Sequence, residues 1–200
     1  MIEQRDAARE ARGQGIRVVL GMAALMWVVE VIDTIDHHRL DQWGIEPRDV
    51  DGLRGVVAAP FLHAGFDHLI ANTIPFVVLG LLIALNGVVR VLAVTAIVML
   101  VGGLGTWVFA PENTLHLGAS GVVFGYASYL ISRGVFDKSV LELGLGAIVV
   151  AVWGGALLTS LVPREGISWQ GHLFGAIGGL AAAWVLASRP RPATSPARGG

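Results

Sequence analysis

The sequence predicts an all-α membrane protein in which six transmembrane helices form one bundle and a long external loop follows the first helix. The 200-residue chain is 54% hydrophobic and 14% charged, with a mean hydropathy of +0.67. A soluble domain carries about a quarter charged residues. Apolar runs near the roughly 20 residues that cross a bilayer recur along the chain. The 27 glycines also suit membrane helices, because close backbone approach stabilises their association.

The composition narrows the functional classes. The chain has no cysteine, which excludes disulfides, a thiolate nucleophile and cysteine-ligated metals. The formal net charge of −1 gives no argument for nucleic acid. We therefore expect membrane lipids as surroundings, no nucleic-acid partner, and no cofactor.

The first span is expected at about residues 16–35, preceded by a short, charged cytoplasmic tail at residues 1–15. Near the far end of this span, Glu30 and Asp33 either sit in water at the interface or face the bundle interior, because ionisable groups avoid hydrocarbon. A long acidic loop follows at residues 36–62. It is suited to short helices at the membrane surface, with Trp43 as an interfacial anchor.

Five further spans are expected at residues 68–85, 88–109, 120–132, 140–162 and 169–187. Asn86-Gly87 predicts a tight turn between the second and third spans. The fourth span is short for a full crossing, so its first residue, Ser120, is expected below the membrane surface. The six-span domain then covers residues 16–188. Residues 189–200 are rich in Pro, Arg, Ser and Gly and predict a disordered tail.

Basic side chains are distributed unequally between the two ends of these spans. The side of the termini carries Arg5, Arg9, Arg12, Arg17, Arg90, Arg133, Lys138, Arg189, Arg191 and Arg198. The opposite side carries only Arg39, Arg48, Arg54 and Arg164. By the positive-inside rule, the protein is a multi-pass protein of the cell membrane with cytoplasmic termini. The start of the fourth span and the long loop then lie toward the outside.

Ser120 begins the fourth span within Gly118-Ala119-Ser120-Gly121. These small residues either let two helices pack closely or surround a nucleophile. If the fourth and sixth spans pack together, Ser120 Oγ and a His172 nitrogen come within about 2.6–3.2 Å, the geometry of an activated serine. Both spans carry glycines at four-residue spacing, namely Gly121 and Gly125 on the fourth and Gly171, Gly175 and Gly179 on the sixth.

Polar side chains gather at the expected depth of Ser120. His68 and Asn72 are four residues apart and share one helix face. A serine nucleophile needs donors for the developing oxyanion, and the Ser120 N–H, the Asn72 amide and His68 are candidates. No carboxylate lies near His172 in its helix, which favours a Ser–His dyad with Phe124 packed on the imidazole.

Two other interpretations use the same polar residues. A metal site from His63, His68, His116 and His172 is conceivable, but neither helix has a carboxylate or cysteine at ligand spacing, and we expect no metal. A small transporter would need polar groups across the whole membrane thickness. Here they cluster near one face.

Three motifs resemble the rhomboid family of intramembrane serine proteases: Gly118-Ala119-Ser120-Gly121, His68-x-x-x-Asn72 and Gly171-His172-x-x-Gly175. The resemblance covers about residues 50–185. It implies Ser120 as nucleophile, His172 as general base, and an oxyanion hole of His68, Asn72 and the Ser120 amide. Gly118 falls at the glycine of the family's GxSG motif.

The resemblance also implies single-span membrane proteins as substrates, cut near small residues, with the fifth span or residues 166–170 moving at the entrance. The alternative is a catalytically inactive rhomboid-like protein that binds membrane helices. Two positions depart from the family pattern. Leu53-Arg54 stands where the family typically has a Trp-Arg pair, and Phe124 stands where it often has a tyrosine. A subsidiary hypothesis places Asp33 close enough to influence His172.

Overall fold

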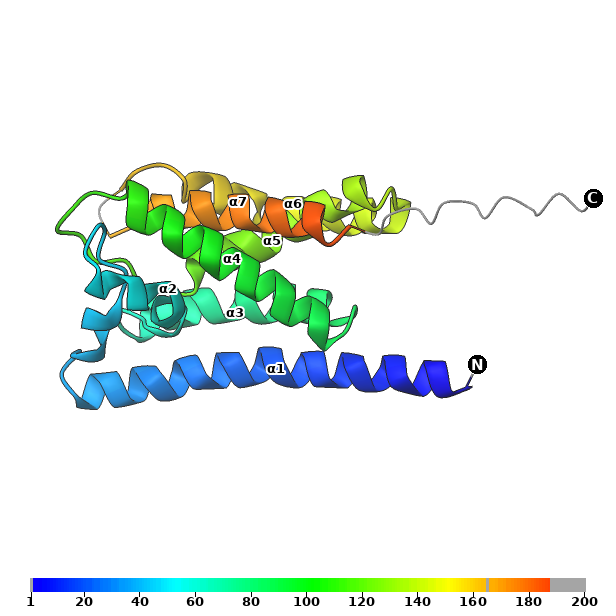
Figure 1. Cartoon of the computed structure of the whole chain (residues 1–200), viewed down its shortest axis with the longest axis horizontal. Helices are drawn as coiled ribbons and strands as arrows, with labels where there is room; N and C mark the ends of the chain where they lie inside the picture. The colour runs from blue at the N-terminus through cyan, green and yellow to red at the C-terminus, as the bar shows by residue number, and fades with distance from the viewer. Residues whose placement is uncertain (1, 165, 188–200) are drawn as a thin grey trace, which may run out of the picture.

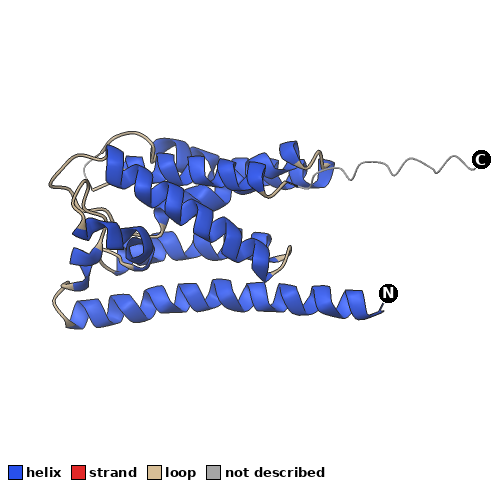
Figure 2. Cartoon of the chain, in the orientation of Figure 1, coloured by secondary structure: helices blue, strands red, loops and turns tan. Residues whose placement is uncertain are grey.

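The computed structural model describes residues 2–164 and 166–187, and the tail expected at residues 189–200 lies outside them. Over the described residues the chain is all-helical, with seven α-helices and three short 3-10 helices (Figures 1 and 2). The α-helices are α1 (Ile2–Ile35), α2 (Gly55–Ala58), α3 (Phe66–Ala84), α4 (Val88–Phe109), α5 (Ser120–Phe136), α6 (Val140–Thr159) and α7 (Trp169–Val185). The 3-10 helices are η1 (Leu40–Trp43), η2 (Asp51–Arg54) and η3 (Ala59–Phe61).

Four of the described helices are long and apolar enough to cross a membrane: α1, α3, α4 and α6. The protein is therefore a multi-pass membrane protein. Helices α5 and α7 have 17 residues each, which is short for an independent crossing. Both pack against α4 and against each other (Figure 1).

Glycines in the left-handed region precede two of the long helices. Gly65 has φ +103° before α3 and Gly87 has φ +91° before α4. Residues other than glycine rarely adopt these angles. The turn expected at Asn86-Gly87 is present, and α4 has the expected bounds. Helix α3 begins two residues earlier than expected and α6 ends three residues earlier.

Two helices extend more than three residues beyond the expected spans. Residues 2–15 continue α1 instead of forming a separate tail, because this segment has no proline and is rich in Ala, Glu, Gln and Arg, which favour helices. Helix α5 runs to Phe136, past Arg133, where a span was expected to end. The Arg133 side chain is neutralised within the fold, so its charge does not stop the helix.

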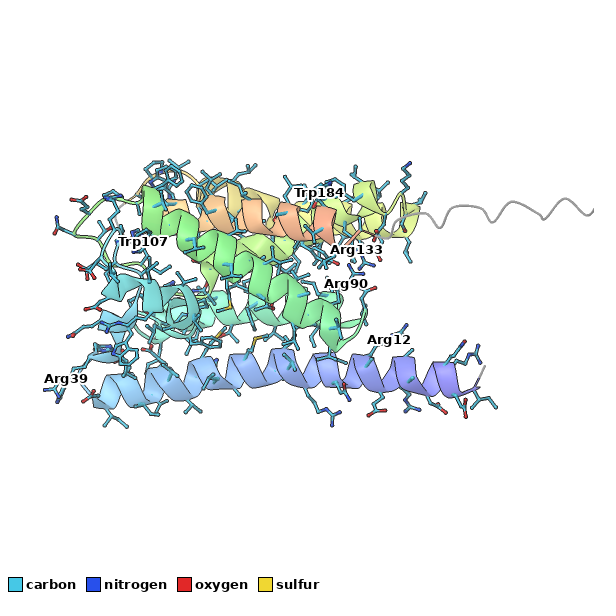
Figure 3. The ribbon with its side chains drawn as sticks, viewed as in Figure 1. Arg12, Arg39, Arg90, Trp107, Arg133 and Trp184 are labelled. Carbon is cyan, nitrogen blue, oxygen red and sulfur yellow. The ribbon has the colours of Figure 1, made fainter. Side chains whose placement is uncertain are left out.

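Arg133 is buried at the end of the bundle away from the long loop, near Arg90 (Figure 3). Its guanidinium Nε donates to Asp137 at 3.0 Å, and Nη2 lies 3.0 Å from both the Asn86 oxygen and Glu142 Oε1. Arg133→Ala should lower the free energy of unfolding by about 3–5 kcal/mol, because it removes the cation from a largely buried network of ion pairs and hydrogen bonds. Unfolding in mixed detergent micelles measures this loss. Arg133→Lys keeps the charge and should lose less, and a loss below about 1 kcal/mol for alanine would contradict the argument.

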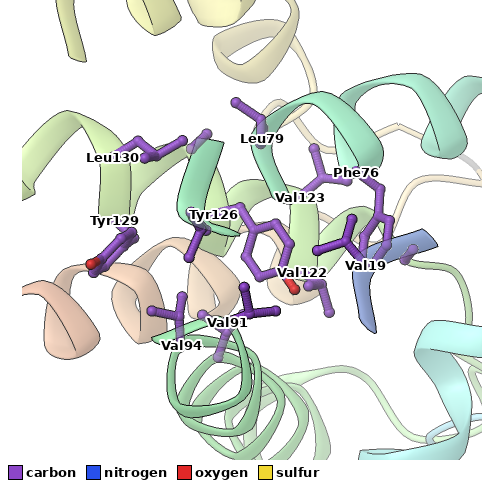
Figure 4. Close-up of a cluster of buried hydrophobic side chains, with 14 of the residues drawn as sticks. Val19, Phe76, Leu79, Val91, Val94, Val122, Val123, Tyr126, Tyr129 and Leu130 are labelled. Carbon is purple, nitrogen blue, oxygen red and sulfur yellow. The ribbon is translucent and has the colours of Figure 1, made fainter. Parts of the chain in front are cut away.

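The core lies where α5 meets α1, α3 and α4 (Figure 4). Phe76 of α3 stacks on Tyr126 of α5 with ring centroids 5.5 Å apart. The Tyr126 hydroxyl lies 2.5 Å from Thr95 Oγ1 of α4, so the polar end of this buried ring has a partner. Val19 of α1 and Leu79 of α3 complete this part of the core. The packing holds α5 centrally, and thereby fixes its first residue.

The loop between α1 and α3 is folded against the outer ends of α4 and α5. Arg48 donates to the carbonyls of Val108 and Ala110 and pairs with Glu112 at 2.8 Å. Trp107, at the end of α4 (Figure 3), donates its indole N–H to Asp49 O at 2.7 Å. These bonds tie the loop to the residues that precede α5.

Trp43 and Arg54 form a pair across this loop. The Arg54 guanidinium lies 4.9 Å from the centroid of the Trp43 ring, a cation–π contact. A tryptophan and an arginine thus meet in space although Leu53 precedes Arg54 in the sequence. Trp43 is about half exposed, which suits the interfacial position expected for it.

Glu30 and Asp33 are buried, each with 1% relative exposure. They face the protein interior, so the interpretation in which they sit in water was wrong. Both follow Met26, a core residue, on the buried side of α1.

Candidate active site

Ser120 is the first residue of α5, and His172 lies in the first turn of α7. Ser168 caps α7 by accepting the Gly171 N–H at 3.3 Å, which starts the helix just before His172. Ser120 Oγ lies 2.9 Å from His172 Nε2. The two residues that the sequence singled out, 52 positions apart, are within hydrogen-bond distance.

The partners of the His172 ring define its tautomer. Nδ1 lies 2.8 Å from the Ser160 carbonyl oxygen, which can only accept. Nδ1 therefore carries the proton, and Nε2 accepts the Ser120 hydroxyl. Phe124, one turn after Ser120, stacks on the imidazole with centroids 4.3 Å apart and an interplanar angle of 3°. A backbone carbonyl and a ring orient His172 where a carboxylate does so in a triad.

Glycines bring α5 and α7 into backbone contact. A Cβ at Gly175 would lie 2.1 Å from Gly121 O, and one at Gly179 would lie 2.0 Å from Gly125 O. Real Cβ atoms do not approach a carbonyl oxygen so closely, so neither position can hold a larger residue without moving a helix. At Gly171 a Cβ would lie 2.8 Å from Ser168 Oγ. This close packing sets the separation of Ser120 and His172.

His68 and Asn72 line the same cavity as Ser120 and His172. Asn72 is buried, and its amide donates to the His68 carbonyl at 2.9 Å. One of the two amide hydrogens is used in this bond. Gly118 has φ +110°, and a Cβ there would lie 2.6 Å from His68 Cε1. Glycine is therefore required twice at this position, for its backbone angle and for the neighbouring imidazole.

His63 contacts the segment just before the candidate nucleophile. Its Nε2 accepts the Ala119 N–H at 3.3 Å, and its ring meets His68 edge-on with centroids 5.2 Å apart. Burial, together with the nearby His68, lowers the pKa of His63 to about 4. The ring is therefore neutral at physiological pH and can accept this hydrogen bond.

The depressed pKa of His63 predicts a pH dependence of stability. The folded pKa of about 4 lies below the unfolded value of 6.5, so the stabilising contribution is complete above pH 6.5 and is lost as the pH falls toward 4. The loss should approach about 3 kcal/mol. His63→Gln keeps an acceptor but does not titrate, so its melting temperature should fall less between pH 6.5 and 4. Parallel pH profiles for the variant and the wild type would refute this assignment.

A second histidine–serine contact was not expected from the sequence. Thr114 donates to Pro111 O, so its hydroxyl accepts from His116 Nε2 at 2.8 Å. His116 Nδ1 then accepts the Ser168 hydroxyl at 2.6 Å. This chain of bonds holds the cap of α7. The sequence feature that could have indicated this cap is Ser168 itself, because a serine at the N-cap commonly accepts the backbone N–H three residues later, here that of Gly171.

An open cavity of about 1140 Å³ exposes the Ser120–His172 pair, with His68, Asn72 and Trp153 also in its lining. The cavity is large enough for water to enter, so the Ser120 hydroxyl is accessible. A smaller pocket of about 50 Å³ lies on another side of Ser120, lined by Met99, Gly102 and other mostly apolar or small residues.

The contacts of the described residues bear on two further hypotheses about ionisable residues. Asp33 accepts the Leu40 N–H at 2.7 Å and lies 3.4 Å from His38, so its carboxylate is engaged away from His172. The four histidines considered for a metal do not form a ligand group within the described residues. The metal-type group found there is Asp33, His38 and Asp41 instead.

A multi-pass helical protein with an accessible serine–histidine pair has the arrangement that serine hydrolases use for nucleophilic chemistry. The chain belongs to the rhomboid family, since the family model described as Rhomboid domain matches residues 51–189.

The chain is similar to proteins of several organisms. Uncharacterized protein Rv1337 of Mycobacterium tuberculosis is 43% identical over 194 residues, covering 93% of this chain and 81% of the relative. A protein of Bacillus subtilis named "Putative rhomboid protease YdcA" is 32% identical over 119 residues, 59% of each chain. Rhomboid-like protein 11, chloroplastic, of Arabidopsis thaliana is 29% identical over 147 residues, 67% of this chain and 52% of the relative.

Proposed function

We propose that this protein is an intramembrane serine endopeptidase that hydrolyses peptide bonds in or near transmembrane segments. The observation that carries the proposal is the 2.9 Å contact between Ser120 Oγ and His172 Nε2, with the imidazole already in the acceptor tautomer. Membership of the rhomboid family and the likeness to the Bacillus subtilis protein support the same activity.

In the proposed reaction, Ser120 Oγ attacks the scissile carbonyl carbon while His172 Nε2 takes its proton. The Ser160 carbonyl stabilises the resulting imidazolium through Nδ1. The imidazolium then gives the proton to the leaving amine, and an acyl-enzyme on Ser120 remains. Water, activated by the neutral His172, hydrolyses this ester and restores the serine.

The oxyanion is proposed to bind at the start of α5. The Ser120 N–H belongs to the first turn of a helix, whose amides lack intrahelical acceptors. Asn72 keeps a second amide hydrogen for the oxyanion, and His68 is the third candidate donor. Such donors stabilise charge that develops only in the transition state.

The proposed substrates are single-span membrane proteins. An intact helix shields its carbonyls, so the substrate must unwind locally before Ser120 can attack. The pocket of about 50 Å³ beside Ser120 is suited to a small side chain next to the cleaved bond. Helix α6 is the least buried of the four long apolar helices and packs mainly on α5. It is the candidate to move aside, together with residues 166–170.

We further propose six membrane crossings with cytoplasmic termini, counting the short α5 and α7. The excess of basic residues on the side of the termini supports this orientation. Helix α1 begins and α7 ends at the same end of the bundle, while the long loop lies at the opposite end (Figure 1). The Ser120 cavity would then open toward the outside of the cell membrane, where water is available.

Reconstitution with a single-span substrate tests the proposal. The wild-type protein in proteoliposomes should release two fragments, with the cut near a small residue. Ser132→Ala, a serine three turns further along α5 that bonds to the nearby carbonyls of Ser128 and Tyr129, should cleave normally. If Ser120→Ala cleaves as fast as the wild type, the protease proposal fails, and a rhomboid-like protein that binds membrane helices without cutting them becomes the better account.

A further inference from the structure

A cluster of ionisable side chains lies where α1 ends, apart from the Ser120–His172 pair. Asp33 belongs to the last turn of α1, His38 to the reversal after it, and Asp41 to η1. Arg39, at this end of α1 in Figure 3, marks the reversal. One ligand-type atom from each of the three residues lies within 4.8 Å of the other two.

The spacing of these atoms is close to that of a metal site. His38 Nδ1 lies 3.4 Å from Asp33 Oδ2 and 3.9 Å from Asp41 Oδ2. In a tetrahedral site with bonds of about 2.0–2.1 Å, ligand atoms are separated by roughly 3.3 Å. The two separations from His38 Nδ1 therefore exceed this spacing by only about 0.1 and 0.6 Å.

Three buried carboxylate oxygens of Glu30 and Asp33 have no hydrogen-bond partner among the described residues. Asp33 Oδ1 accepts the Leu40 N–H at 2.7 Å, which orients the group, but the fully buried Oδ2 makes no hydrogen bond among the described residues. Both carboxylate oxygens of Glu30, one turn earlier on α1, are likewise buried without a hydrogen-bond partner there. Glu30 and Asp33 are each 1% exposed. Unpaired buried carboxylates are costly unless a cation compensates them.

The surrounding side chains supply little positive charge. His38 is the basic group in contact with Asp33 and Asp41, and its side chain is 50% exposed. Arg39 lies 3.6 Å from Asp36 instead. Three carboxylates therefore face one imidazole.

We propose that Asp33, His38 and Asp41 bind one zinc ion, with Glu30 adding negative charge behind Asp33. Two carboxylate oxygens and an imidazole nitrogen suit zinc, whereas calcium and magnesium prefer oxygen ligands alone. All three ligands lie within the nine residues from Asp33 to Asp41, at the junction of α1 and η1. The ion would hold this reversal closed and fix the start of the long loop, so its role is structural.

The chain offers a matched pair of variants for the test. His37 and His38 are adjacent exposed histidines with φ +57° and +60°, angles that asparagine tolerates. His37→Asn and His38→Asn therefore perturb the backbone alike, but only the second removes a proposed ligand. The full-length protein is purified in detergent without a histidine tag, stripped with a chelator and dialysed against zinc chloride.

The wild type and His37→Asn should each retain one zinc ion per chain and melt at a higher temperature with zinc. His38→Asn should bind zinc on the order of tenfold more weakly or worse, and should lose the zinc-dependent shift. Asp33→Asn should behave like His38→Asn. Metal content of the folded wild type gives the decisive reading, because it needs no variant.

Three results would overturn the proposal. These are a wild type that holds no zinc after dialysis, a His38→Asn variant that retains as much zinc as His37→Asn, and a melting temperature raised as much by calcium as by zinc at equal concentration. Retention by His38→Asn would place the ion on other histidines. All these readings are independent of proteolysis, so they stand whether or not Ser120 is a nucleophile.

Discussion

Ser120→Ala should lower the rate of substrate cleavage by about 10⁴–10⁶-fold while leaving the fold intact. The hydroxyl is the proposed nucleophile, and its removal leaves nothing at the 2.9 Å position beside His172 Nε2 to attack a carbonyl. His172→Ala should cause a loss of similar size, because an unactivated serine is a weak nucleophile.

The double variant distinguishes a catalytic pair from two separate effects. If Ser120 and His172 act together, the Ser120→Ala/His172→Ala protein should be no slower than either single variant. Rates are measured in the same proteoliposomes, with melting temperatures as the control for folding. Losses that multiply in the double variant would contradict a shared step.

Gly175→Ala should reduce cleavage by on the order of 100-fold or more, although Gly175 touches no reacting group. A methyl group there would lie 2.1 Å from Gly121 O, so α5 and α7 must move apart. That movement lengthens the Ser120–His172 contact, and misplacement by about 1 Å is enough for such a loss. The melting temperature should fall as well, because the helix contact is lost.

Gly144→Ala is the matched control. Gly144 is in helix α6, and a Cβ there would have nothing within 4 Å. Since alanine favours helices over glycine by roughly 0.5–1 kcal/mol, this variant should be as stable as the wild type or more so, and fully active. If Gly175→Ala matched Gly144→Ala in rate and melting temperature, close packing of α5 and α7 would not be what positions the pair.

Much of this arrangement followed from local sequence patterns. The run of residues 88–109 predicted α4 because it is apolar and preceded by Asn86-Gly87. The four-residue spacing of Gly171, Gly175 and Gly179 predicted a close-packed face, which is where α7 meets α5. These features depend on neighbours in the chain, so the sequence displays them directly.

Features built by distant backbone groups were not predictable. The carbonyl that orients His172 belongs to Ser160, and any residue could supply it, so no side-chain pattern marks it. Trp43 pairs with Arg54 across a folded loop, whereas the residue that precedes Arg54 in the sequence is Leu53. The Asp33–His38–Asp41 group depends on a left-handed reversal at two histidines, which rarely adopt that conformation.

The buried acids of α1 illustrate the limit of a general rule. Acidic residues near the end of a membrane span are usually solvated. Glu30 and Asp33 are buried instead, and their burial depends on how the α1–α3 loop folds over them. The prediction of where the fourth span ends was wrong for a related reason. Arg133 is charged, but Asp137, Glu142 and Asn86 meet it inside the fold.

Covalent labelling of Ser120 tests the central claim most directly. A fluorophosphonate reacts with a serine only where a base and an accessible cavity activate it, so the wild-type protein in detergent should gain one adduct, mapped to Ser120 by mass spectrometry. His172→Ala should remain unlabelled, and Ser132→Ala should label like the wild type. Absence of an adduct on the folded wild type, or equal labelling after loss of His172, would contradict an activated Ser120–His172 pair.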